Sequence, residues 1–157
     1  IAGPTWAGEP RETSPLTRHL EAVLIQDLVV RFGNGLLTRL AAQLLELASL
    51  AQGGILSSLT PAERSGGATQ GALKPGVGLA QVPAARGRLV HRIALCDGRV
   101  SDYRILAPTE WNFHPRGVVA VGLDAIAGRV VGPELGPLAR LFVAAVDPCV
   151  DFDLEWA

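Results

Sequence analysis

An alternating apolar pattern from Leu89 to Cys96, followed at once by Asp97-Gly98, is the feature that most restricts how this chain can fold. Positions of one parity carry Leu, His, Ile and Leu, which suits a strand with one apolar face. An Asp-Gly pair between two such segments favours a two-residue hairpin turn. The sequence therefore predicts a β-hairpin whose second strand runs from Arg99 to Ala107.

Two amphipathic helices are predicted before the hairpin. Ser14 followed by Pro15 is typical of a helix start, and an apolar stripe continues from there to Gly33. Asn34 can cap a second helix that ends at Gly53-Gly54. We expect the two helices to form an antiparallel pair with their stripes in the core. The stripes consist of Leu16, Leu20, Val23, Leu24 and Leu28, and of Leu36, Leu37, Leu40, Leu44, Leu45 and Ala48.

The remaining chain contains one long irregular segment and two further helices. Residues 55–85 are rich in Gly, Ser and Pro without periodicity, which predicts a loop. Helices are expected over 118–127 and 134–146, the second entered through Pro133 and stopped by Asp147-Pro148. The predicted fold class is α+β, predominantly helical with one β-hairpin, in a single domain over residues 1–157.

Composition narrows the function classes. The chain is 48% hydrophobic and its formal net charge is −1, so part of its apolar surface is expected to face a partner, and nucleic-acid binding is disfavoured. No apolar run is long enough to span a bilayer. Two cysteines cannot form a disulfide framework, which favours a reducing cytoplasm. The chain begins at Ile1 and contains no Met, so we expect residues upstream of it.

Three polar segments stand out against this apolar background. In residues 85–91, Gly87 permits a close backbone approach, and Arg86 either points at a ligand or pairs with a carboxylate, while His91 is expected to be a satisfied core residue. In residues 107–116, Thr109 and Asn112 either serve a site or satisfy local backbone groups. In residues 147–152, Cys149 is either a small buried residue or a thiolate for a soft metal.

Taken in order, these segments resemble the nickel-iron hydrogenase large subunit, in its C-terminal half. Residues 85–91, A-R-G-R-L-V-H, are similar to the family pattern A-R-G-x-L-x-H, and residues 108–112, P-T-E-W-N, to P-T-x-W-N. Residues 147–149, D-P-C, open the terminal D-P-C-x-x-C-x-x-H. Upstream, residues 12–18, E-T-S-P-L-T-R, resemble E-T-G-P-L-A-R.

The resemblance implies a cofactor site. In that family, nickel and iron share four cysteine thiolates, and the iron also carries two cyanides and one carbon monoxide. Bound cyanide requires hydrogen-bond donors, and carbon monoxide requires apolar walls. By resemblance, Arg86 and Thr109 are the cyanide donors, Leu89 and Pro108 wall the pocket, and Cys149 is the metal ligand.

The sequence departs from the family at the nickel ligands. Phe152 stands where the bridging cysteine is expected and Glu155 where the terminal histidine is expected, while Pro83 replaces an acidic residue that many members carry. Only Cys96 and Cys149 are present, so no nickel is expected. The pattern resembles HupK-type hydrogenase expression proteins, which implies a non-catalytic iron scaffold whose partners are maturation chaperones and the hydrogenase large subunit. Two alternatives remain: an interaction module without metal that recruits those chaperones, and a hydrogenase fragment whose other ligands lie upstream.

Overall fold

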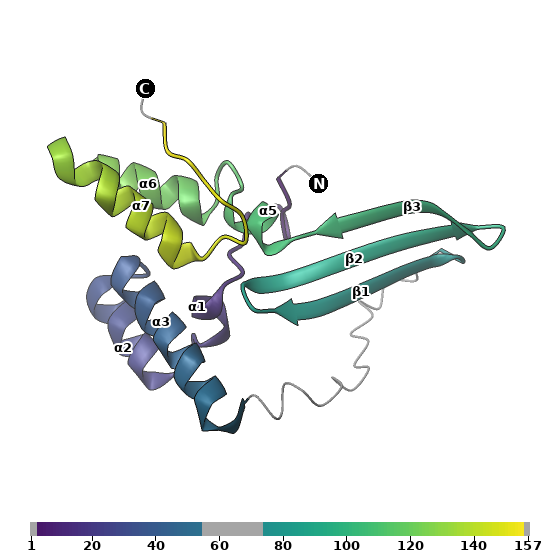
Figure 1. The fold of residues 1–157 in the computed structure, drawn as a ribbon, viewed down its shortest axis with the longest axis horizontal. Helices are drawn as coiled ribbons and strands as arrows, with labels where there is room; N and C mark the ends of the chain where they lie inside the picture. The colour runs from purple at the N-terminus through teal and green to yellow at the C-terminus, as the bar shows by residue number, and fades with distance from the viewer. Residues whose placement is uncertain (1–2, 55–73, 156–157) are drawn as a thin grey trace.

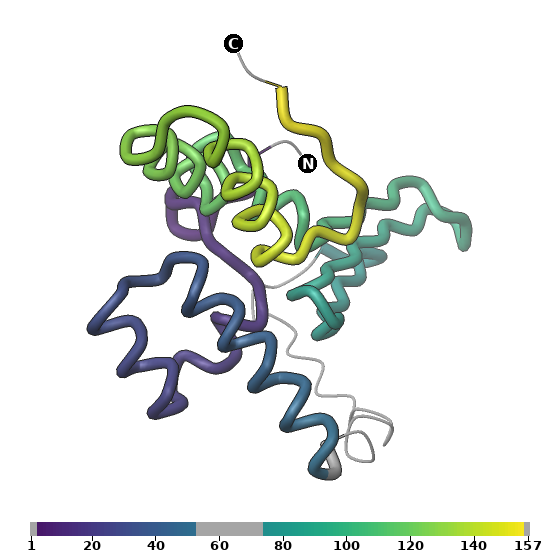
Figure 2. Tube along the Cα trace, turned by 60° about the vertical axis from the view of Figure 1, so that its left-hand side comes forward, coloured from purple at the N-terminus to yellow at the C-terminus, as the bar shows by residue number. Residues whose placement is uncertain are grey.

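Helices and a three-stranded sheet make up the computed structural model, which describes residues 3–54 and 74–155 (Figure 1). Figure 2 shows α6 and α7 as one helical pair lying above the pair formed by α2 and α3. The sheet projects away from the helices (Figure 1). The helices are α1 (Pro15–Arg18), α2 (Val23–Phe32), α3 (Leu36–Ser49), α5 (Pro108–Asn112), α6 (Val118–Ala127) and α7 (Leu135–Val146), with a π-helical turn at Leu50–Gly54 and a 3-10 turn at Gly132–Glu134. The strands are β1 (Val77–Ala84), β2 (Gly87–Cys96) and β3 (Arg99–Leu106).

The predicted hairpin is confirmed, but it is part of a larger sheet. β2 and β3 pair antiparallel, and Asp97 and Gly98, both at positive φ, form the turn between them. A third strand, β1, pairs antiparallel with β2 and gives the order β1-β2-β3. The prediction of one hairpin was therefore wrong by one strand.

β1 lies in the segment that the sequence predicted to be a loop, because its composition hides it. Pro83 is tolerated because, in the described part of the chain, β1 is an edge strand, where a missing N–H breaks no ladder. Gly78 faces β2, and a Cβ there would lie 3.2 Å from Cγ2 of Ile93. The rest of that predicted loop, residues 55–73, lies outside the described residues.

The two N-terminal helices differ from their prediction. The first is broken into α1 and α2 by a turn at residues 19–22, where the Nε2 atom of His19 lies 2.5 Å from Oε2 of Glu46 on α3. Ser14 occupies the N-cap position, but its hydroxyl donates to Glu12. Gly35, not Asn34, precedes α3. The helices predicted over 118–127 and 134–146 are confirmed as α6 and α7.

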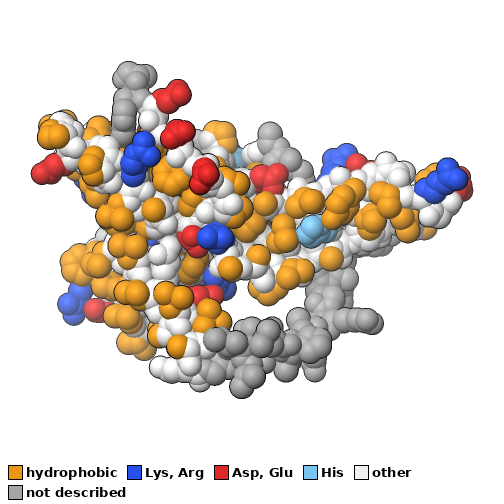
Figure 3. All heavy atoms as spheres, in the orientation of Figure 1, with side chains coloured by type: hydrophobic (Ala, Val, Ile, Leu, Met, Phe, Trp, Pro, Cys, Tyr) orange, Lys and Arg blue, Asp and Glu red, His pale blue; other side chains and the backbone are white. Residues whose placement is uncertain are grey.

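The core is small and divided into two clusters. One lies between α6 and α7 and includes Phe142, Val143 and Val146, and the other joins α1, α2 and α3 around Ile25 and Ala42. The predicted stripes are only partly buried: Leu24 on α2 and Leu44 on α3 are 53% and 67% exposed. Hydrophobic side chains also gather over the visible face of the sheet (Figure 3). The expected apolar surface is therefore present on both the helices and the sheet.

Thr13 joins the N-terminal segment to both the sheet and α5. Its backbone N–H donates to Oδ1 of Asn112 at 2.9 Å, and Nδ2 of Asn112 donates back to the Thr13 carbonyl at 2.8 Å. The backbone N–H of Arg88 donates to Oγ1 of Thr13 at 2.7 Å. Asn112 is only 2% exposed, so the two bonds between Thr13 and Asn112 are largely shielded from water.

A buried ion pair ties the same segment to the helices. The Nη2 atom of Arg39 on α3 lies 2.7 Å from Oε2 of Glu12, and its side chain is 2% exposed. The guanidinium carbon also lies 5.2 Å from the ring centre of Phe142 on α7. Arg39 therefore links α3, α7 and the N-terminal segment. Within the described ranges, no helix is long and apolar enough to cross a membrane.

Replacement of Gly87 by Ala tests the contact with Thr13. Gly87 has φ +140°, and a Cβ there would lie 2.6 Å from the Thr13 carbonyl oxygen. We expect Gly87→Ala to lower the free energy of unfolding by about 2 kcal/mol or more, measured by urea unfolding. Gly98→Ala is the matched control, because Gly98 also has positive φ but a Cβ there would contact nothing within 4 Å. Equal losses in the two variants would contradict the role of this close approach.

Candidate functional site

A cluster of polar side chains forms where the segment after α7 passes α5 and the start of β2. Asp147 ends α7 in the left-handed conformation, at φ 60°, and this turn carries the chain toward α5. The three predicted site residues that meet here are Arg86, Thr109 and Cys149. They come from the β1–β2 turn, from α5 and from the C-terminal segment.

Thr109 and Cys149 are in direct contact. Oγ1 of Thr109 lies 2.9 Å from Sγ of Cys149, and either atom can be the donor. Cys149 is exposed, so the interpretation of this residue as a small buried hydrophobe is wrong. The thiol is therefore reachable from solvent and is oriented by a hydroxyl group.

Arg86 is paired with the carboxylate of Asp147. Its Nε atom lies 3.0 Å from Oδ1 of Asp147, and both side chains are partly exposed, at 47% and 34%. The hydrogen bond that Arg86 donates to Asp147, and then the attraction of the carboxylate charge, raise the pKa of Arg86 above its ordinary value. Asp147 lies two residues before Cys149, so this ion pair brings Arg86 to the segment that carries the thiol. The carboxylate-pairing interpretation of Arg86 is thus observed, at the edge of the cluster.

The two predicted apolar wall residues differ in position. Pro108 is buried in the first turn of α5, directly before Thr109. Leu89 is half-buried on β2, opposite Val82 of β1. His91 is hydrogen-bonded as expected, since its Nδ1 atom lies 2.7 Å from the Tyr103 hydroxyl, but it is half-buried on the sheet and not part of the core.

The local roles proposed for Thr109 and Asn112 were wrong. Both side chains reach partners far along the sequence: Thr109 contacts Cys149, and Asn112 contacts Thr13. The reason is that residues 108–112 form the helical turn α5, from which one side chain reaches Cys149 and the other reaches Thr13. The local sequence does not indicate these distant partners. It indicated Asp147 only as the residue that ends α7.

Phe152 belongs to the apolar packing instead of the polar cluster. It packs, together with Leu154, against the cluster of Phe142, Val143 and Val146. Glu155 is exposed. Among the described residues, no group of three or more His, Cys, Asp or Glu side chains is arranged to hold a metal ion.

Comparison with known proteins gives consistent relatives. No family model matches the sequence. The hydrogenase expression/formation protein HupV of Azotobacter chroococcum mcd 1 is 39% identical over 149 residues, which cover 95% of this chain and 39% of that protein. The hydrogenase expression/formation protein HoxV of Cupriavidus necator is 38% identical over 160 residues, 98% of this chain and 40% of that protein. The uptake hydrogenase large subunit of Rhizobium leguminosarum bv. viciae matches a smaller part, 48% of this chain, at 46% identity.

These matches make the chain a homologue of the proteins named for hydrogenase expression and formation, with weaker similarity to the uptake hydrogenase large subunit. Within that class it fits a HupK-type protein, and the HupK protein of Azotobacter vinelandii is 45% identical over 80 residues, 51% of this chain. The chain spans about two fifths of the length of the HupV and HoxV relatives.

Removal of the Asp147 charge should change the reactivity of Arg86. A raised pKa means that the guanidinium is more firmly protonated, so Asp147→Asn should lower the pKa and increase the neutral fraction at a given alkaline pH. Phenylglyoxal attacks neutral guanidine. We therefore expect faster labelling of Arg86 in Asp147→Asn, measured by peptide mass spectrometry. Arg129, an exposed residue after α6, serves as the internal reference. An unchanged ratio of the two labelling rates would contradict the pairing.

Proposed function

We propose that this chain acts in the maturation of nickel-iron hydrogenase, as part of a scaffold for the iron fragment that carries cyanide and carbon monoxide. The observation that carries the proposal is the exposed contact between Cys149 and Thr109, with the ion pair of Arg86 and Asp147 two residues earlier in the same segment. The names of the relatives support a maturation role. The iron fragment is cargo in this proposal, and its destination is the hydrogenase large subunit.

Each residue of the cluster has a distinct role in the proposal. The Cys149 thiolate binds the iron, because thiolates are among the few protein ligands soft enough for iron with carbon monoxide. The Nε–H of Arg86 donates to Asp147, and the other guanidinium N–H groups can donate to a cyanide nitrogen. The Thr109 hydroxyl interacts with the thiol in the free protein and can turn to donate to a second cyanide.

The donor set suits an iron fragment better than the complete nickel-iron site. Phe152, at the position of the bridging thiolate, cannot ligate a metal, and it packs in the core. An iron whose other positions are filled by diatomic ligands needs fewer protein ligands. We therefore propose a non-catalytic paralogue of the large subunit, with the same fold, that does not turn over hydrogen.

A second candidate function is an interaction module that recruits maturation chaperones without binding metal. The exposed apolar side chains on α2, α3 and the sheet favour it, because contiguous exposed apolar surface commonly marks a protein interface. Binding of iron separates the two candidates. In both, the chain works in the cytoplasm, where hydrogenase subunits are assembled.

Cys149→Ser tests the metal ligand directly. The protein, purified anaerobically from cells that make the hydrogenase maturation proteins, should contain iron and show infrared bands of metal-bound cyanide and carbon monoxide. Because a serine hydroxyl is a hard and weak ligand, Cys149→Ser should lose both the iron and the bands while it keeps its circular dichroism spectrum. Cys96→Ser is the matched control, since Cys96 is also exposed, and it should retain both. Iron retained in Cys149→Ser would favour the interaction module.

Arg86→Leu tests the cyanide donor. Loss of the guanidinium removes a charge-assisted donor, so the variant should retain less cyanide-bearing iron, and its cyanide bands should shift. Arg88→Leu, which changes a neighbouring arginine that bonds to Gln81, should leave iron content and bands unchanged. Identical spectra for Arg86→Leu and the unmodified protein would restrict Arg86 to its structural pairing with Asp147.

A further inference from the structure

One face of the sheet carries more positive charge than its own residues neutralise. Arg88, Arg92 and Arg104 share this face with Gln81 and Asp102, and these five residues are called the basic sheet face. Nη1 of Arg88 donates to the neutral amide oxygen of Gln81 at 2.8 Å. Arg92 and Arg104 both bind Asp102, at 2.5 and 3.1 Å. Three guanidinium groups therefore face one carboxylate.

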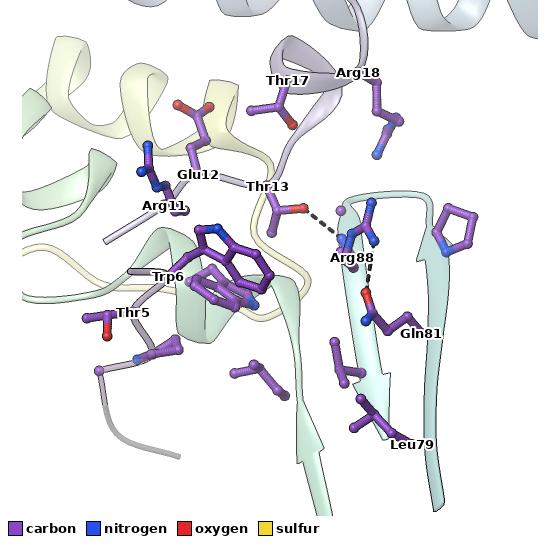
Figure 4. A pocket seen from close by; sticks show the side chains of 17 residues that line it. Thr5, Trp6, Arg11, Glu12, Thr13, Thr17, Arg18, Leu79, Gln81 and Arg88 are labelled. Carbon is purple, nitrogen blue, oxygen red and sulfur yellow. Dashed lines mark hydrogen bonds between the residues drawn. The ribbon is translucent and has the colours of Figure 1, made fainter. Parts of the chain in front are cut away.

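A cavity of about 1080 Å³ opens at the Arg88 end of this face. Figure 4 shows Trp6 from the N-terminal segment facing Arg88 of β2, with Arg11 on the far side of the indole. Apolar side chains complete the lining: Leu79, Val90, Leu106 and Trp111. The cavity therefore combines aromatic and aliphatic walls with basic groups.

The charge of this cavity is also positive. Glu12 lines it, but its carboxylate is already paired with Arg39. Arg18 lines it as well and is paired with Glu46. Among the described residues, Arg11 has no ion-pair partner, and the guanidinium group of Arg88 bonds only to the neutral amide of Gln81. Two guanidinium groups are thus available to an occupant at the place where the apolar walls meet the basic sheet face.

We propose that the cavity and the basic sheet face bind an acidic polypeptide segment that also carries apolar side chains. The carboxylates of such a segment complement Arg11 and Arg88, while its apolar side chains fill the space between Trp6, Val90 and Leu106. This site is separate from the Cys149 cluster and does not depend on iron binding.

A polypeptide fits these observations better than other anions. Nucleic-acid binding draws most of its affinity from many contacts of Lys and Arg with phosphates, and this face supplies only a few uncompensated guanidinium groups. The cavity, of about 1080 Å³, is slightly larger than the range of about 300 to 1,000 Å³ for small-molecule pockets, and it continues onto the charged sheet face. An extended chain can occupy both regions at once.

The test uses the fluorescence of Trp6 and Trp111 in a Trp156→Phe background, which removes the third tryptophan. The probe is a short synthetic peptide of alternating Glu and Leu. It should change the fluorescence in a saturable way and bind less tightly as salt increases. Arg88→Gln and Arg11→Gln should each weaken binding about three- to fivefold, and Arg88→Lys should restore most of the affinity. Arg31→Gln on α2 is the matched control and should have no effect, because Arg31 is paired with Asp27.

Several results would overturn the proposal. Equal binding of a Lys-Leu peptide would show that charge is not recognised. Tighter binding of oligothymidine of similar length would identify a nucleic-acid surface, and saturation of the same signal by succinate would identify a small-anion site. Full affinity in both Arg88→Gln and Arg11→Gln would remove the residues on which the proposal rests.

Discussion

The pair of hydrogen bonds between Thr13 and Asn112 is the contact on which the rest of the structure depends. It joins segments 99 residues apart and places the N-terminal segment against α5. Gly87 makes a second close approach to Thr13 possible, which fixes where the β1–β2 turn lies. Because Glu12 then reaches the buried Arg39, the helical layer is attached through the same segment. The apolar clusters in the described residues are small. These polar contacts therefore determine how the helices and the sheet are arranged relative to one another.

The residues that carry the resemblance to the hydrogenase large subunit therefore divide into two groups. Gly87 and Asn112 each contact Thr13, and these contacts hold the elements in place. The second group consists of Arg86, Thr109 and Cys149. Each lies one to three residues along the chain from Gly87, from Asn112 or from the end of α7, and all three belong to the exposed cluster. Because the first group positions the elements that carry the second, we expect a change in Thr13 or Asn112 to disturb the cluster although neither residue contacts it.

The sequence predicted the elements with strong periodicity and missed those that depend on distant partners. The hairpin after Leu89 and the helices α6 and α7 were predicted closely, because alternation, Asp-Gly and Pro133 are local signals. β1 was missed since its Gly and Pro are permitted only by its place at the sheet edge. The break at His19 was missed because it depends on Glu46 of α3. In the same way, the sequence named Arg86, Thr109 and Cys149 but could not name Asp147 as the partner of Arg86.

The C-terminal segment is held by protein contacts on both sides of Cys149. Before it, Asp147 is paired with Arg86, and after it, Phe152 and Leu154 pack against the core around Phe142. Where the resemblance places a metal-bridging thiolate, this chain thus has an apolar anchor. A segment that metal ligation holds in place would loosen when the metal leaves, whereas this one keeps its position through packing and an ion pair. That arrangement is consistent with the proposed scaffold role, in which Cys149 holds a cargo and later releases it, because release would leave the contacts around Cys149 unchanged.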